Sequence, residues 1–234
     1  MNYLAIDAST EACSVALQYN GNIYSRYEFC PQSHSLLLLP MVDEVLKEAG
    51  AKLADLDGLI FGRGPGSFTG VRIGVGVAQG LAFSANLPLV GVSTLQAMAQ
   101  LAYLQEGETQ VIAAIDARMS EVYNGYFELE SMSDSISIMQ EKITEAVTPP
   151  NAVAERLKQV TGASYGVGTG WEAYKEALTE LKTNQGEPKV LFPHAEAMLE
   201  IGIAAFKRGE GISAEEAQPV YVRDTVSWKK LPGR

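Results

Sequence analysis

Apolar and polar positions near the N-terminus predict three antiparallel strands. Residues 3–6 are apolar and end at Asp7, residues 14–19 alternate as a half-buried strand does, and residues 23–29 form a third strand. Asn20-Gly21 joins the last two strands, and this dipeptide favours a two-residue hairpin turn because both residues tolerate positive φ. The chain is therefore expected to begin as an antiparallel meander.

Helical periodicity then alternates with short apolar runs. Helices are predicted over residues 35–49, 69–84 and 94–104, and short strands over residues 58–61 and 89–92. Strands that alternate with helices after an antiparallel start predict an α/β fold with mixed sheets.

The pattern of the N-terminus starts again in the middle of the chain. Residues 111–117 repeat the layout of residues 3–8, including the tripeptide Ile-Asp-Ala, and residues 121–129 follow as residues 14–19 do in the first copy. A repeat of this length indicates duplicated domains and not a solenoid.

The repeat sets the expected domain boundaries. We expect an N-terminal domain over residues 1–105, a C-terminal domain over residues 106–212, and an extended return of residues 213–234 to the first domain. Within the second half, the pattern predicts a serine-rich loop and then further elements, which are a loop at 130–137, helices at 151–160, 171–183 and 195–208, and a strand at 164–167.

The most distinctive segment is the glycine-rich stretch at residues 61–76. It follows a strand and opens a helix, and such a junction gathers backbone N–H groups that suit a phosphate or another anion. It has neither the Lys-Ser/Thr of a Walker A loop nor the glycine spacing of a dinucleotide fingerprint. Two interpretations stay open: a binding element, or glycines that let a helix approach its neighbours closely.

Composition narrows the class of protein. The 234 residues are 47% hydrophobic, enough for a substantial core, and the two cysteines, Cys13 and Cys30, form no disulfide framework. No signal peptide is visible, and the longest nearly apolar stretch, residues 71–85, is too short and polar to span a bilayer. We expect a cytoplasmic protein with no membrane partner.

The net charge of −10 argues against direct nucleic-acid binding. Such affinity depends largely on Lys and Arg replacing counterions on the phosphate backbone, and no large basic cluster is present. If the chain serves nucleic-acid chemistry, we expect a partner to hold the nucleic acid.

Four segments resemble the TsaB (YeaZ) family of the actin-like ATPase superfamily. They are Leu-Ala-Ile-Asp-Ala-Ser-Thr at residues 4–10, Gly-Pro-Gly-Ser-Phe-Thr-Gly-Val-Arg-Ile-Gly at 64–74, Pro-Leu-Val-Gly-Val-Ser-Thr-Leu at 88–95 and Pro-Val-Tyr-Val-Arg at 219–223. The resemblance implies an α/β fold of two duplicated actin-like (ribonuclease H-like) domains, each a mixed sheet flanked by helices.

The resemblance also implies a function. The chain would be a non-catalytic subunit of the complex that transfers a threonylcarbamoyl group to N6 of adenosine 37 in tRNAs. It would activate a TsaD-like catalytic paralogue, with a TsaE-like ATPase as a further partner and tRNA bound only by the complex. ATP, Mg²⁺ and a metal ion would belong to the partner subunits, and no peptidase activity is expected. The alternative is a stand-alone actin-like small-molecule kinase or ATPase.

The paralogue's metal ligands have no counterparts here. The resemblance places Thr94 and Met98 where TsaD carries two histidines one helical turn apart, and a hydroxyl and a thioether suit a divalent ion poorly. The chain's histidines, His34 and His194, lie in different segments. We therefore expect no metal site and no catalytic residue in this chain.

Phosphate-binding loops could persist in vestigial form. The alternative is that the aspartates only cap turns, as Asp often does. The candidate residues are Asp7, Ser9, Thr10, Gly64, Gly66, Ser67 and Asp116.

Apolar residues on two helices predict a partner interface. Positions 38, 42, 45, 46 and 49 form one helical stripe that suffices to seat the first helix on its sheet, so its remaining apolar residues need another burial surface. That surface is either the second domain or a partner, which would be the TsaD-like paralogue or, in isolation, a second copy of the chain. The expected interface comprises Leu36, Leu37, Leu39, Pro40, Met41, Gly70, Arg72, Gly74, Gly76, Val77 and Gly80.

Overall fold

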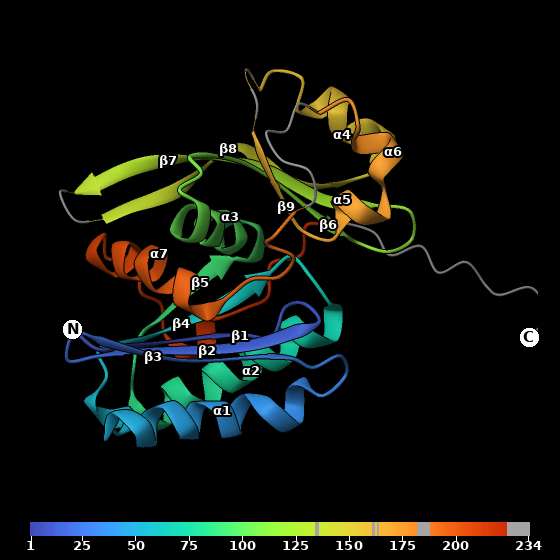
Figure 1. Cartoon of the computed structure of the whole chain (residues 1–234). Coiled ribbons are helices and arrows are strands. Elements are labelled where there is room, and N and C mark those ends of the chain that lie inside the picture. The colour runs from blue at the N-terminus through green and yellow to red at the C-terminus, as the bar shows by residue number, and fades with distance from the viewer. Residues whose placement is uncertain (134–135, 161, 163, 182–187, 224–234) are drawn as a thin grey trace, which may run out of the picture.

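The computed structural model describes residues 1–133, 136–160, 162, 164–181 and 188–223. Two sheets alternate with layers of helices (Figure 1). Helices α1 (His34–Ala49) and α2 (Phe68–Ala85) cover the outer face of the first sheet, and α3 (Thr94–Glu106) and α7 (Ala195–Lys207) lie between the sheets.

The first sheet contains β1 (Tyr3–Asp7), β2 (Ala12–Tyr19), β3 (Asn22–Phe29), β4 (Gly58–Gly64) and β5 (Leu89–Ser93) in the order β3-β2-β1-β4-β5. The first three strands pair antiparallel, and β4 and β5 extend the sheet in parallel. The predicted turn between β2 and β3 is confirmed, since Asn20 and Gly21 both have positive φ, as a tight hairpin requires.

The second sheet repeats this plan. It contains β6 (Gln110–Asp116), β7 (Val122–Ser133), β8 (Ile136–Thr148) and β9 (Tyr165–Val167) in the order β8-β7-β6-β9, with three antiparallel strands followed by a parallel one. The loop predicted at residues 130–137 is wrong where it is described, because residues 130–133 and 136–137 belong to β7 and β8. Serine side chains do not prevent backbone pairing at the far end of a long hairpin, where Ser131 pairs with Ser137.

The helices α1 and α2 bury one stripe each against the first sheet. Leu38, Val42 and Val45 of α1 are buried, as the periodicity predicts, and they share a core cluster with β1, β2, β4 and α2. The helix α2 begins at a side-chain cap, in which the Ser67 hydroxyl accepts a hydrogen bond from Gly70 N. The helices α1 and α2 lie side by side on the outer face of the first sheet, as Figure 1 shows.

The two helices between the sheets, α3 and α7, each pack on the sheet of the other half of the chain. By sequence α3 belongs to the first half, yet it packs on β6, β7 and β8 of the second sheet. Conversely, α7 packs on the first sheet, and Gly202 allows a close approach: a Cβ there would lie 2.4 Å from the Ile60 side chain. Because each half supplies a helix that packs on the other half's sheet, the two sheets and their helices form one continuous stack of layers.

Short helices cover the far face of the second sheet: α4 (Pro150–Arg156), α5 (Gly170–Ala173) and α6 (Lys175–Leu178). The single helix predicted at 171–183 is wrong over its described part. Tyr174, with φ of −130°, interrupts it, and its hydroxyl donates to Asp116 at 2.9 Å. Residues 182–183 lie outside the described residues.

The C-terminal segment runs back along the first sheet. Ile212 pairs with Leu89, Gln79 Nε2 donates to the carbonyl oxygens of Ala214 and Ala217, and Val220 N donates to Arg63 O at 2.8 Å. Short 3-10 helices stand at Leu53–Asp55 and Ala214–Glu216. Within the described ranges, no helix has both the length and the apolarity to cross a membrane.

Candidate functional site

One face of α2 is open along most of its length. Phe68, Arg72, Gly76, Gly80 and Phe83 follow at helical spacing and are all exposed. A Cβ built on Gly76 or Gly80 would meet nothing within 4 Å. The exposed fractions of Phe68 and Phe83 are 62% and 73%, so this face combines room for a close approach with large apolar side chains at its ends.

An aromatic cluster marks the N-terminal end of this face. The Arg72 guanidinium lies 3.3 Å from the ring centroid of Phe68 and 5.0 Å from that of Tyr221. Tyr221 comes from the returning C-terminal segment, within the motif at residues 219–223. The stacked cation holds both rings in place at the surface.

The other glycine row of α2 faces inward. A Cβ on Gly70 would lie 2.2 Å from the carbonyl oxygen of Ala8, and one on Gly74 would lie 3.7 Å from Ala8. Both glycines are buried, and Val77 packs on the core. Packing within the chain accounts for the two buried glycines, whereas Val77 is only half-buried.

On α1, the expected interface residues divide in the same way. Leu36 is 73% exposed and Leu39 is 49% exposed, and Pro40 is exposed beside them. Leu37 is half-buried against the core, and Met41 is only 7% exposed inside it. Met41 therefore lies on the buried stripe of α1 and not off it, which corrects the assignment made from periodicity.

The two candidate phosphate loops contact each other directly. Ser67 N donates to Ser9 O at 2.7 Å, and a Cβ on Gly66 would lie 2.0 Å from the same oxygen. Gly64 has a φ of +95° and precedes a cis peptide bond to Pro65. The glycines thus permit a close backbone contact, which is the packing interpretation of this segment.

A buried chain of hydroxyls leads from α3 to Asp7. Thr94 Oγ1 donates to Ser9 Oγ at 2.9 Å, and Ser9 donates to Asp7 Oδ2 through both its hydroxyl and its backbone N–H at 3.1 Å. Burial raises the pKa of Asp7 to about 6, although the hydrogen bonds from Ser9 act to lower it. Asp7 Oδ1 has no hydrogen-bond partner among the described residues, and Gly62 leaves room for it.

The second aspartate occupies the matching place in the second sheet. Asp116 accepts hydrogen bonds from Arg118 N and from Tyr174 Oη, both at 2.9 Å, and pairs with the Arg118 guanidinium. Arg118 also bridges to Glu11 at 3.0 Å, which ties the two repeated turns together. Each aspartate accepts from the backbone N–H two residues later, as a turn-capping Asp does.

The start of α3 holds Thr94 and Met98 inside the protein. The Thr94 hydroxyl is engaged with Ser9, and the Met98 side chain is fully buried in the core around β6. A different group of metal-ligand side chains does come together among the described residues, namely Cys13, Cys30 and His34. The hairpin turn at Asn20-Gly21 was the available signal, because it sets the pairing that brings the cysteines together.

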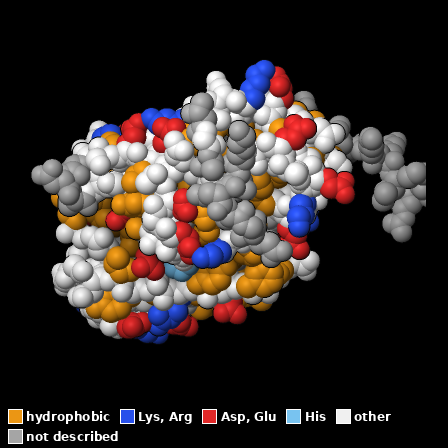
Figure 2. Space-filling model, turned by 45° about the horizontal axis from the view of Figure 1, so that its top comes forward, with side chains coloured by type: hydrophobic (Ala, Val, Ile, Leu, Met, Phe, Trp, Pro, Cys, Tyr) orange, Lys and Arg blue, Asp and Glu red, His pale blue; other side chains and the backbone are white. Residues whose placement is uncertain are grey.

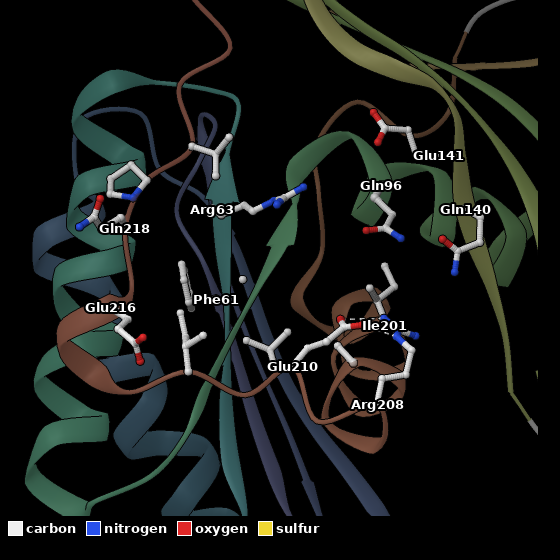
Figure 3. A pocket seen from close by; sticks show the side chains of 16 residues that line it. Phe61, Arg63, Gln96, Gln140, Glu141, Ile201, Arg208, Glu210, Glu216 and Gln218 are labelled. Atoms are coloured by element: carbon white, nitrogen blue, oxygen red, sulfur yellow. Dashed lines mark hydrogen bonds and ion pairs between the residues drawn. The ribbon is translucent and has the colours of Figure 1, made fainter.

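A hollow of about 580 Å³ lies between β4, β5, β8 and the end of α7 (Figure 3). Arg63 points into it from β4, and Gln96 and Gln140 face it from the second sheet's side. Arg63 Nε has no partner in the part of the chain that is described, while Arg208 forms two contacts with Glu210. Sequence patterns gave no sign of this site, since its residues come from separate elements.

Charges of both signs are mixed on one face of the molecule. On the face shown in Figure 2, basic and acidic side chains are interspersed and form no continuous basic area. In a chain with a net charge of −10, this face gives the phosphate backbone of a nucleic acid little to bind.

Known proteins with this sequence pattern match the chain over its full length. A family model described as "TsaD: tRNA N6-adenosine threonylcarbamoyltransferase" matches residues 27–230. A protein of Escherichia coli (strain K12), named "tRNA threonylcarbamoyladenosine biosynthesis protein TsaB", is 49% identical over 234 residues, which are 100% of both chains. A protein of the same name from Haemophilus influenzae is 45% identical over 100% of this chain and 98% of its own.

A solved structure also matches the fold over nearly the whole chain. The structure named "YeaZ from Pseudomonas aeruginosa" is 46% identical, covers 94% of this chain and 99% of its own, and superposes with a TM-score of 0.83. The two repeated mixed sheets flanked by helices are thus the actin-like, ribonuclease H-like fold that the motifs implied. The chain belongs to the TsaB (YeaZ) family.

Proposed function

We propose that the protein is a non-catalytic subunit of the complex that transfers a threonylcarbamoyl group to N6 of adenosine 37 in tRNAs. It holds and activates a TsaD-like catalytic paralogue, and a TsaE-like ATPase joins the two in the cytoplasm. The observation that carries this proposal is the 49% identity, over the full length of both chains, to a relative named for threonylcarbamoyladenosine biosynthesis. The mixed surface charge supports a role in which tRNA is bound by the complex and not by this chain alone.

The chain contributes no catalytic group and no cofactor of its own in this proposal. The hydroxyl of Thr94 is engaged internally and Met98 is buried, so neither position offers a ligand to a divalent ion there. The loops around Ser9 and Gly66 contact each other directly, which supports a packing role for their glycines. ATP, Mg²⁺ and the paralogue's metal ion accordingly belong to the partner subunits.

The partner binds across the exposed faces of α1 and α2. Large apolar side chains are exposed on both helices, and Gly76 and Gly80 leave open space between them and an approaching helix. Because the partner is a paralogue, a second copy of this chain presents the same helices and forms a homodimer when the paralogue is absent. The contacting set is Leu36, Leu39, Pro40, Phe68, Arg72, Gly76, Gly80 and Phe83.

Reconstitution tests the proposed role. The purified chain, its TsaD-like paralogue and the TsaE-like ATPase are mixed with a tRNA transcript, ATP and the threonylcarbamoyl donor, and the modified nucleoside is quantified by mass spectrometry. Modification is expected only when this chain and the paralogue are both present. Modification at the same rate without this chain would overturn the proposal.

ATP turnover separates the proposal from the kinase alternative. The chain alone should hydrolyse no ATP above background, whereas the complex should. Steady turnover by the isolated chain that requires Asp7 would instead indicate a stand-alone actin-like enzyme.

A further inference from the structure

Two cysteines and a histidine meet where the β2–β3 hairpin ends and α1 begins. Cys13, Cys30 and His34 each offer one potential ligand atom, and these atoms all lie within 4.8 Å of one another. All three side chains are buried. The cluster is separate from Thr94 and Met98, the positions at which the paralogue's ligands would stand.

The hairpin register brings the cysteines together. Cys13 pairs with Glu28, and Ala12 pairs with Phe29, so that Cys30, whose N–H donates to Glu11 O at 2.9 Å, is the diagonal neighbour of Cys13. Diagonal neighbours on one face of an antiparallel pair are within reach of each other's side chains. Both cysteines face the core that α1 covers, where His34 is the first helical residue.

The histidine makes the kind of hydrogen bond that a metal-binding imidazole usually makes. His34 Nε2 donates to the carbonyl oxygen of Thr10 at 2.6 Å, because a carbonyl can only accept. That bond fixes the proton on Nε2 and leaves the lone pair on Nδ1 free to coordinate. A metal-binding imidazole is almost always held by such a hydrogen bond from its other nitrogen.

We propose that Cys13, Cys30 and His34 bind one soft or borderline metal ion, for which Zn²⁺ is the test case. Two sulfur ligands and one imidazole form a donor set that zinc accepts. On binding, the two thiols release two protons to solvent. The two thiolates then balance the charge of the dication, so that the buried site is neutral overall.

The ion would connect the hairpin to the start of α1. Ser33 stands at the N-cap of α1, yet its side chain makes no capping hydrogen bond. Coordination through His34 would anchor this first turn, which carries Leu36 and leads into the turn that carries Leu39. The inference concerns metal binding by the isolated chain, so its test is independent of the proposed role in tRNA modification.

Cobalt titration tests the site directly, because the chain has only two cysteines. Reduced, chelator-treated protein is titrated with Co²⁺, and the thiolate-to-cobalt charge-transfer absorption is followed. The band should saturate at one equivalent per chain and disappear when Zn²⁺ is added. Absence of the band in the wild-type protein would overturn the proposal without recourse to any variant.

Substitutions then locate the ligands. Cys13→Ser, Cys30→Ser and His34→Asn should each abolish the band, whereas His194→Asn, at the chain's other histidine, should leave it unchanged. A band of full intensity in Cys13→Ser or Cys30→Ser would contradict the assignment. Zinc should also slow the reaction of both wild-type thiols with a disulfide reagent, and equal reactivity with and without zinc would contradict it too.

Discussion

The buried carboxyl group of Asp7 couples folding to pH. Its pKa is raised to about 6 by burial, against an ordinary value of 3.8 in the unfolded chain. Between these values the folded state holds a proton that the unfolded state has lost, so the free energy of unfolding falls as the pH rises. The contribution is unfavourable above the folded pKa and absent below the unfolded one.

Replacing Asp7 by Asn removes this charge at every pH. The free energy of unfolding of Asp7→Asn should therefore increase relative to that of wild type by about 1–3 kcal/mol between about pH 4 and pH 8, since one pKa unit corresponds to about 1.4 kcal/mol. Urea unfolding of chelator-treated samples measures it. Asp43→Asn, on the exposed side of α1, is the control and should show a smaller change with pH. A difference for Asp7→Asn that does not vary with pH would contradict the prediction.

At the scale of elements, the two glycine rows of α2 should respond oppositely to alanine. In the monomer a Cβ at Gly76 meets open space, so Gly76→Ala, made in a chain kept monomeric by Leu36→Glu and Leu39→Glu, should stabilise the fold by about 0.5–1 kcal/mol through helix propensity. A Cβ at Gly70 would collide with the backbone oxygen of Ala8, so Gly70→Ala should destabilise it by about 1–3 kcal/mol. Chemical denaturation measures the free energy of unfolding of both variants. Changes of the same sign would contradict the assignment of one glycine row to open space and the other to close packing.

Elements with strong local signals could be predicted from the sequence. The Asn20-Gly21 turn depends on residues within a few positions, and the structure has it. The serine-rich end of the β7–β8 hairpin was missed because its pairing depends on the partner strand and not on its own composition. The prediction of one helix at 171–183 was wrong for a similar reason. Tyr174 leaves helical geometry, and its hydroxyl donates a hydrogen bond to Asp116 on β6.

The candidate site was predicted in part. Leu36 and Leu39 are exposed as expected, because one apolar stripe sufficed to seat α1. Met41 was misplaced because the buried stripe is wider than the positions chosen: it lies three residues after Leu38 and four before Val45. The cluster of Cys13, Cys30 and His34 needs hairpin register and helix placement together, and the sequence signals only the register, through the Asn20-Gly21 turn.

At the scale of the whole molecule, the open faces of α1 and α2 should decide the state of assembly. Leu36→Glu with Leu39→Glu places two charges on the exposed apolar face and leaves the core intact, so the double variant should sediment as a monomer where wild type sediments as a dimer. Leu104→Glu, an exposed leucine near the end of α3, is the control and should remain a dimer. A dimeric double variant would place the contact on another surface.

The proposed role requires that this protein bind a TsaD-like paralogue through that same face. The direct measurement is sedimentation of the paralogue with wild type, with the Leu36→Glu and Leu39→Glu double variant, and with Leu104→Glu. Wild type and Leu104→Glu should form a one-to-one complex, and the double variant should lose at least about tenfold in affinity, which corresponds to about 1.4 kcal/mol. Failure of the wild-type chain to bind the paralogue would contradict the account.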